Sequence, residues 1–196
     1  MVVNKSYFYM CPVCGYGEIY KGGMKTPERH KDHKNYRQFD CNCTDLKGVK
    51  LGHRFRTDVA RITIPSLVTG EFKDAHPMAL SFLYAFLEGI SEALNIDRND
   101  IEGLIEINVD TLSYDVLIYD NVPGGAGHVK RLTNKDAILK SLYAARGKVS
   151  QNCCDEETSC YNCLRNYYNQ MFHSRLKRRL AREFTEGLIR EIEGLK

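Results

Sequence analysis

The cysteines of this 196-residue chain fall into two compact groups of four, and side chains of this type at this spacing can hold a metal ion. The later group lies within eleven positions and consists of Cys153, Cys154, Cys160 and Cys163. Thiolates packed this densely suit a tetrahedral Zn²⁺ site, in which the sulfur atoms converge at about 2.3 Å from one ion. The sequence therefore predicts a four-cysteine zinc knuckle. Because two of these cysteines are adjacent, it leaves open whether one is a spectator and His173 is the fourth ligand.

The earlier group has the form Cys-Pro-Val-Cys-Gly at residues 11–15, followed by Cys-Asn-Cys at residues 41–43. The glycine after the second cysteine lets backbone N–H groups turn toward the thiolates. We predict a second structural zinc site here, in a segment that does not fold without metal. Its expected ligands are Cys11, Cys14, Cys41 and Cys43. The return pair is unusually tight, so three histidines are spare candidates: His30, His33 and His53.

Composition places the chain among globular proteins, with 43% hydrophobic and 27% charged residues. The net charge is only +3, so a nucleic-acid role must rest on a local patch. No apolar run approaches the roughly 18 residues of a membrane span, and the first residues lack a signal-peptide core. We therefore expect a cytoplasmic protein without a membrane partner, in which clustered cysteines bind metal rather than form disulfides.

Hydrophobic periodicity predicts an α+β fold, with a small mixed or antiparallel sheet covered by helices. A strand should end at Pro65, two later strands should form a hairpin whose second member is central, and Gly147 should stop a helix. The strand order does not follow from the sequence. The predicted elements are strands at 54–64, 105–109 and 114–119, and helices at 75–94, 135–145 and 176–192.

A glycine-rich turn follows the predicted central strand and contains Asp120, Gly124, Gly125, Gly127 and His128. Glycines permit positive φ, and a helix N-terminus presents free N–H groups, so this turn could bind a phosphate or another anion. The equal alternative is a tight structural turn that packs helix against sheet. The turn lacks the endings of a Walker loop and of a dinucleotide fingerprint. Asp120 with His128 also admits a metal-dependent or acid/base site, as in a nuclease-like hydrolase.

Basic residues accumulate beyond the second cysteine group. Six of them, and no acidic residue, lie between Ser159 and Arg182. They could form a phosphate-binding face, and their attachment to a zinc knuckle favours nucleic acid. The alternative is a solvated helix face or one that pairs with acids. The candidate nucleic-acid-binding residues are Arg165, Arg175, Lys177, Arg178, Arg179 and Arg182.

Residues 119–127 and the run Ser-Cys-Tyr-Asn-Cys-Leu-Arg-Asn-Tyr-Tyr-Asn-Gln-Met-Phe-His at 159–173 resemble the MrfA-type zinc-binding domain. That family sits at the C-terminal end of superfamily 2 DEAD/DEAH-box helicases involved in DNA repair. The form in this chain is most similar to the DrmB-like version of DISARM antiphage systems. The resemblance covers roughly residues 51–180 and implies zinc at the four later cysteines. The family usually separates its first cysteine pair by one residue, whereas here the pair is adjacent.

The chain has no Walker A motif and no DEAD/DEAH box, so it is not expected to be a helicase itself. We expect a zinc-ribbon-like module at 1–50 and an MrfA-type domain at 51–196. The resemblance implies a non-enzymatic accessory module or subunit of a superfamily 2 helicase system, in DNA repair or antiphage defence, which contacts DNA or docks the helicase. A nuclease-like hydrolase and a purely protein-docking zinc domain are the alternatives.

Overall fold

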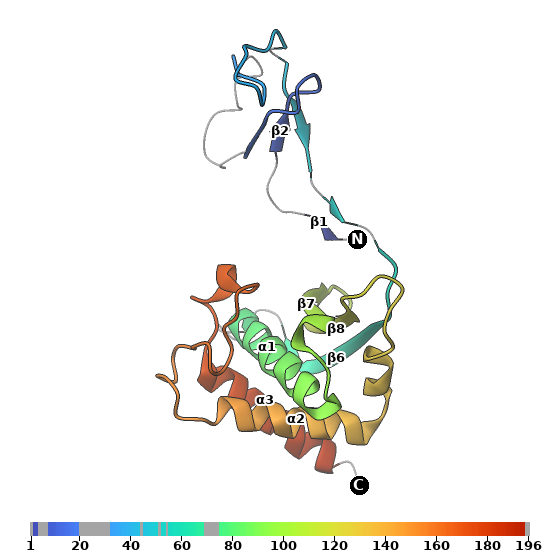
Figure 1. Cartoon of the computed structure of the whole chain (residues 1–196). Coiled ribbons are helices and arrows are strands. Elements are labelled where there is room, and N and C mark those ends of the chain that lie inside the picture. The colour runs from blue at the N-terminus through green and yellow to red at the C-terminus, as the bar shows by residue number, and fades with distance from the viewer. Residues whose placement is uncertain are drawn as a thin grey trace. The chain divides into compact units, whose positions relative to one another are not determined.

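In the computed structural model, the described residues are 2–3, 8–19, 32–43, 45–50, 52–53, 55–68 and 75–194. The chain divides into two compact units, Met1–Phe55 and Arg56–Lys196 (Figure 1). The predicted α+β class is confirmed. Each unit has a small antiparallel sheet and a cysteine cluster, and the described helices lie in the second unit. The assignment of residues 1–50 to a zinc-ribbon-like module and of residues 51–196 to an MrfA-type domain remains a prediction.

The first unit is built from short strands. β2 (Phe8–Met10) pairs antiparallel with both β3 (Gly17–Ile19) and β4 (Lys47–Val49), and β1 (Val2–Val3) pairs with β5 (Gly52–His53). Sheets of two or three such short strands are marginal by themselves. A further source of stability is therefore needed in this unit.

The second unit contains a three-stranded antiparallel sheet in the order β6-β8-β7. Its strands are β6 (Val59–Val68), β7 (Ile101–Asn108) and β8 (Ser113–Asp120). β7 and β8 pair in continuous register from Ile101 opposite Asp120 to Asn108 opposite Ser113. The predicted hairpin and the predicted central position of its second strand are both confirmed.

β6 differs from its prediction at both ends. It begins at Val59 and continues past Pro65, so the prediction that proline ends the strand is wrong. The pairing with β8 shifts register between Thr63 and Val68. Such a bulge interrupts the hydrogen-bond ladder, and an edge strand can hold proline there because proline lacks an N–H donor.

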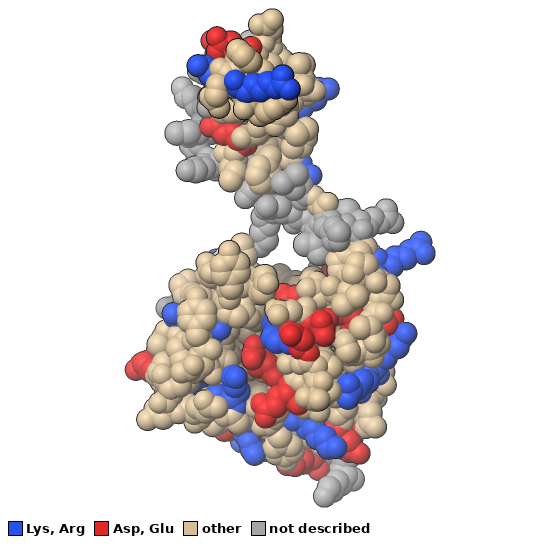
Figure 2. Space-filling view, in the orientation of Figure 1, with Lys and Arg blue, Asp and Glu red and all other residues tan. Residues whose placement is uncertain are grey.

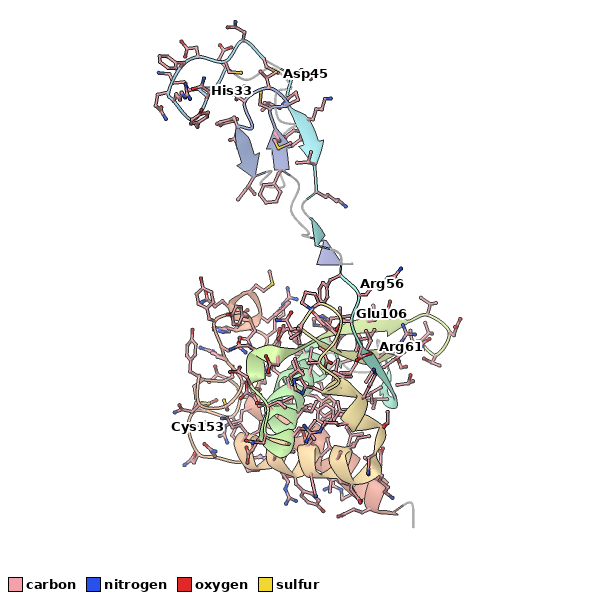
Figure 3. All side chains as sticks on the ribbon, turned by 45° about the vertical axis from the view of Figure 1, so that its right-hand side comes forward. His33, Asp45, Arg56, Arg61, Glu106 and Cys153 are labelled. Atoms are coloured by element: carbon pink, nitrogen blue, oxygen red, sulfur yellow. The ribbon has the colours of Figure 1, made fainter. Side chains whose placement is uncertain are left out.

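One charged contact spans this sheet. The Arg61 guanidinium of β6 donates to the Glu106 carboxylate of β7 at 2.8 Å and lies 3.7 Å from the buried Asp115 carboxylate of β8 (Figure 3). An arginine placed between two carboxylates offsets the cost of burying one of them. The role of these three side chains is therefore to stabilise the sheet.

α1 (Ala75–Leu94) occupies the predicted helix and lies between the sheet and a pair of helices, α2 (Lys135–Val149) and α3 (Arg178–Gly194) (Figure 1). All residues from Ala79 to Leu87 are buried. A helix that is apolar on nearly all sides is one that is covered on nearly all sides. The core of the second unit is built around it.

α2 is longer than predicted. It starts after Asn134, whose side chain accepts from the Asp136 N–H, and continues through Gly147, so the prediction that this glycine stops the helix is wrong. Three 3₁₀ turns complete the unit, η1 (Arg98–Asp100), η2 (Val129–Thr133) and η3 (Gln170–Phe172). In the described part of the chain, no helix is long and apolar enough to cross a membrane.

Candidate metal centres

The second unit gathers four thiols at one point. The Sγ atoms of Cys153, Cys154, Cys160 and Cys163 all lie within 4.8 Å of one another. Three of the separations are 3.8 Å for Cys154–Cys163, 3.8 Å for Cys160–Cys163 and 4.0 Å for Cys153–Cys154. Four sulfurs at about 2.3 Å from a tetrahedral ion are separated by about 3.8 Å. The cluster therefore has the dimensions of a zinc–tetrathiolate site.

The local backbone explains how this cluster forms. The carbonyl of Cys160 accepts from the N–H groups of Cys163, Leu164 and Arg165, which closes a tight turn between the two cysteines. The Cys160 N–H points at the Cys163 sulfur, 3.1 Å away. Burial raises the pKa of the Cys163 thiol to about 12, so in the absence of a cation this thiol stays protonated. A bound cation reverses that balance and favours the thiolate.

Arg178, at the start of α3, anchors the cluster to the helices. Its side chain is 3% exposed and donates to the carbonyls of Val149, Gln151 and Cys154 at 3.3, 2.6 and 2.8 Å. One guanidinium thus joins the end of α2, the loop behind it and the first cysteine pair. The guanidinium has five N–H donors in a fixed fork, which suits this task.

His173 is not a member of the cluster. Its Nε2 atom lies 3.1 Å from the Asn166 carbonyl and 2.9 Å from Oδ1 of Asn169, and both adjacent cysteines lie inside the cluster. Asn169 is fully buried, and its side chain also bonds the Asn166 N–H and the Leu164 carbonyl. The sequence reasoning missed this role, although asparagine is the residue type whose amide can donate and accept at once.

The first unit has a comparable cluster. The ligand atoms of Cys11, Cys14, His33 and Cys41 lie within 4.8 Å of one another, and the Cys11 and Cys41 sulfurs are 3.9 Å apart. The N–H groups of Val13 and Cys14 approach the Cys11 sulfur at 3.4 and 3.5 Å. The turn between the first two cysteines is completed by Gly15 at φ +75°, where a side chain would be strained.

The structure groups His33 with this cluster, where the sequence predicts Cys43. His33 is buried and stacks on Tyr16, with ring centroids 4.7 Å apart. It stands at the start of a loop closed by a bond from the Cys41 N–H to the His33 carbonyl. The Cys43 sulfur interacts with the Cys11 and Cys41 thiols and also lies 3.7 Å from the Asp45 carbonyl. Of the other spare histidines, His30 lies outside the described residues, and the side chain of His53 is not described.

The electrostatics of this site favour the thiolate at Cys11, whereas at Cys14 the Tyr16 N–H, which lowers the pKa, is outweighed by burial and the neighbouring Cys11 and Cys41, which raise it. Burial by itself raises the pKa of the Cys11 thiol, but the N–H donors of Cys14 and Val13 outweigh it and bring that pKa down to about 6. Cys11 is therefore largely ionised at neutral pH. Thiolate is the form of cysteine that binds metal.

Both clusters fit zinc by their donor sets, four sulfurs in one and three sulfurs with an imidazole in the other. Each could hold one ion, so the chain has residues for two. Four protein ligands leave no open position for water or substrate, so zinc at either site would supply a cross-link rather than a Lewis acid. Zinc in such a site stabilises the fold of the loops that carry its ligands.

Most of the predicted nucleic-acid-binding side chains are already paired. Arg179 contacts Glu157 and Glu183, and Arg182 donates to Glu156 at 2.6 Å. Lys177 lies 3.4 Å from Glu157, and Arg178 is buried, as described above. The contacts from Arg182 and Arg179 lower the pKa of the Glu156 and Glu157 carboxyls respectively, so both are charged at neutral pH. The face is therefore an ion-pair network, and nucleic-acid contact at these four basic positions stays a prediction.

Two members of the predicted set remain. Arg165 donates to the hydroxyls of Ser159 and Thr158, both at 3.1 Å, and is partly buried. Arg175 is exposed, and no ion pair is found for it among the described residues. Any phosphate contact from this region therefore falls chiefly to Arg175.

The glycine-rich turn is a structural turn. Asp120 is fully buried, and its carboxylate accepts from the N–H groups of Ala126, His128 and Val129 at 2.8, 3.2 and 2.9 Å. The Gly125 N–H bonds the carbonyl of Val122. These donors already have protein acceptors, which favours the structural alternative, and anion binding at this turn stays a prediction.

The same contacts remove the hydrolase alternative. Both carboxylate oxygens of Asp120 are occupied within a buried turn, and the segment from Val129 is the short 3₁₀ turn η2 rather than a helix start. His128 instead faces Asp100, with its Nε2 atom 3.8 Å from a carboxylate oxygen. A general acid or metal-binding carboxylate must reach substrate, and this one does not.

Comparisons with known proteins agree with the cysteine geometry. Residues 82–164 match the family described as MZB, the MrfA Zn-binding domain. The chain is 30% identical over 200 residues to the Druantia protein DruE of Escherichia coli (strain UMEA 4076-1), covering 91% of this chain and 10% of that protein. The crystal structure of the DUF1998 helicase MrfA bound to DNA is similar to it with a TM-score of 0.51 and 15% identity, covering 80% of this chain and 19% of that one.

The chain thus spans about a tenth of DruE and about a fifth of MrfA. At 15% identity, the likeness to MrfA shows a shared fold. The relative is a Druantia protein, so assignment to DISARM remains a prediction from the sequence. The matched segment contains the part of α1 from residue 82 onward, the β7–β8 hairpin, α2 and all four later cysteines. Residues 82–164 are therefore similar to the MrfA Zn-binding domain family.

Proposed function

We propose that this chain is an accessory module of a superfamily 2 DNA helicase system, in DNA repair or antiphage defence. In this proposal it contacts DNA and has no catalytic activity of its own. The observation that carries the proposal is the cysteine cluster of the second unit, whose sulfurs all lie within 4.8 Å of one another in a segment that matches the MrfA Zn-binding domain family. A solved relative with this fold is a helicase whose crystal structure includes DNA.

The chemistry of the sites supports the proposal that the chain has no activity of its own. Each cluster supplies four protein ligands, which leaves zinc no coordination position for a substrate. The Asp120 carboxylate is buried and bonded to three backbone N–H groups. The second unit is accordingly a scaffold that presents surfaces.

The helicase would be either a partner protein or another part of the same polypeptide. Both relatives are much longer than this chain, which spans 10% of one and 19% of the other. In either arrangement the module would bring a DNA-contacting surface to the motor. Binding energy from such a contact positions the nucleic acid without chemistry.

The test is a fluorescence-anisotropy titration of the zinc-loaded protein against single-stranded, duplex and forked DNA at two salt concentrations. We expect saturable binding that weakens as salt rises, because phosphate contacts release counterions. Zinc content is measured on the same sample. If zinc is present and none of the three DNAs binds, the DNA contact is wrong, and the module docks protein instead.

A second readout addresses the absence of activity. The same DNAs are incubated with the protein and Mg²⁺ and then separated on a denaturing gel. Intact strands are expected. Cleavage that disappears in Asp120→Asn would contradict the proposal and restore the hydrolase alternative.

A further inference from the structure

The loop between the second cysteine cluster and α3 exposes an unusual set of side chains. Tyr161, Tyr167, Tyr168 and Met171 are 65%, 75%, 71% and 74% exposed, within eleven residues. With the exposed Arg175 they are called here the knuckle surface. Single exposed apolar residues are ordinary, but several large ones together mark a binding site.

The backbone beneath the knuckle surface is fixed. The buried side chain of Asn169 bonds the Asn166 N–H, the Leu164 carbonyl and the ring of His173. In turn, Oδ1 of Asn166 accepts from the N–H groups of Tyr168 and Asn169. A platform held in place before binding loses less conformational entropy when a ligand arrives.

The rings themselves are arranged against neighbours. Tyr167 and Tyr168 meet edge to face, with centroids 5.6 Å apart, and Tyr161 meets His173 in the same way at 5.6 Å. Each pair orients its rings and leaves aromatic area open to solvent. Such faces are what nucleobases stack on.

The charged side chains within the segment from Ser159 to Arg182 are all basic. The neighbouring Glu156 and Glu157 are held by Arg182 and Arg179. In Figure 2 the surface over this loop is largely tan, while red side chains gather nearer the middle of the unit. The unneutralised charge is positive, which favours a polyanion over a typical protein partner.

We propose that the knuckle surface binds single-stranded DNA, with bases stacked on Tyr167 and Tyr168 and a phosphate paired with Arg175. This rests on the proposed function and adds the surface and the strand form. Single strands fit because their base faces are free, whereas duplex bases are already stacked on one another.

The test compares Tyr167→Ala/Tyr168→Ala with Tyr167→Phe/Tyr168→Phe in the full chain, loaded with zinc. The probes are a labelled strand of about 16 nucleotides, an abasic strand of equal length and a duplex. The alanine pair should weaken binding to the base-bearing strand by about 25-fold or more, since each of the two lost stacking contacts costs about fivefold or more. The phenylalanine pair keeps the aromatic faces and should bind like the unsubstituted protein.

The abasic strand separates stacking from phosphate contact. The unsubstituted protein should bind it about as weakly as the alanine pair binds the normal strand, and the alanine pair should bind both strands alike. Zinc content equal to the unsubstituted protein shows that the exposed substitutions leave the fold intact.

Three results overturn the inference. Unchanged binding of the alanine pair to the normal strand places the DNA contact elsewhere and leaves the proposed function standing. Equal binding of normal, abasic and duplex DNA by the unsubstituted protein shows phosphate contact without stacking. No binding of any DNA removes the inference together with the DNA part of the proposed function.

Discussion

Five side chains with metal-binding atoms surround the cluster of the first unit, one more than a tetrahedral ion accepts. His33 is buried at the centre of this set, and the Cys43 sulfur turns toward the Asp45 carbonyl. The pattern of one nitrogen and three sulfurs is as common a structural zinc set as four sulfurs. The choice between the two sets is therefore made by the fold of the loop from His33 to Cys41.

Substitution of His33 and of Cys43 should have opposite effects on zinc binding by the first unit. His33→Ala should weaken zinc at the first unit by more than about 100-fold, because even the loss of a residue behind a ligand costs 10–100-fold. Cys43→Ser should retain zinc. Both are measured as zinc per chain after a competing chelator. Retention in His33→Ala with loss in Cys43→Ser would return the site to the four-cysteine set predicted from the sequence.

Asp120 is a second residue whose role is set by its partners. Asp120→Asn replaces one acceptor oxygen by an amide donor that faces backbone N–H groups at 2.8–3.2 Å. We expect a loss of about 1.5–3 kcal/mol in the free energy of unfolding, the range for hydrogen bonds to a charged group. Urea denaturation measures it. The matched control is Asp110→Asn on an exposed turn, which should change stability little; similar losses in both variants would refute the assignment.

At the scale of elements, the closest approach in the second unit is between α1 and α2. A Cβ at Gly89 would lie 2.1 Å from the Ser141 carbonyl oxygen and 2.8 Å from the Cβ of Ala145. Neither distance is possible, so Gly89→Ala must push the two helices apart. Glycine is needed here for proximity rather than for its backbone freedom.

Gly89→Ala should lower the free energy of unfolding by about 1–3 kcal/mol, the usual cost of overpacking, despite the better helix propensity of alanine. The matched control is Gly187→Ala in α3, where a Cβ meets nothing within 4 Å. That variant should gain up to about 1 kcal/mol. Thermal or urea unfolding measures both, and equal effects of the two would show that the helix contact is not tight.

Two arginines near α3 should differ in function: Arg175 should contribute to DNA binding, and Arg182 should contribute to stability. Arg175→Ala removes an exposed charge, so single-strand affinity should fall and the slope of log affinity against log salt should flatten by about 0.7. Arg182→Ala breaks a pair with Glu156, so it should lower the unfolding midpoint slightly and leave DNA binding nearly unchanged. Anisotropy at several salt concentrations and thermal melts measure both. A stronger DNA defect in Arg182→Ala would restore the helix face as the contact.

At the scale of the whole molecule, the two units differ in what stabilises them. Among the described residues of the first unit, the buried apolar side chains are Cys11 and Leu46, and the buried polar one is His33. Two of these three belong to the metal cluster. The second unit has a large core around α1, in which the cysteine cluster is a peripheral part.

Removal of zinc should therefore have unequal effects. With a strong chelator, the first unit should lose its structure, because little else is buried there. The second unit should keep α1, the sheet and α2, and lose order mainly around the cysteine loop. Hydrogen exchange read by mass spectrometry distinguishes the two. Persistent protection of the first unit without metal would contradict this account.

The sequence by itself determined the features that rest on local pattern. The helix from Ala75 to Leu94, the β7–β8 hairpin and the two groups of cysteines follow from periodicity and spacing. These succeed because neighbouring residues on one chain fix which faces are apolar and which thiols can meet. The prediction that Pro65 ends a strand failed because a bulge, which depends on the partner strand, accommodates it.

Tertiary structure decided what the charged and metal-binding side chains do. Glu156 and Glu157 lie more than twenty residues before Arg182 and Arg179, the arginines with which they pair. The local sequence therefore predicts a basic helix face, whereas the fold forms ion pairs there. Asp120 takes the N–H groups that an anion was expected to bind. His33 enters the first cluster because the loop from His33 to Cys41 is closed by a bond from the Cys41 N–H to the His33 carbonyl. Burial and pairing are set by the chain's return on itself, and spacing in sequence does not encode them.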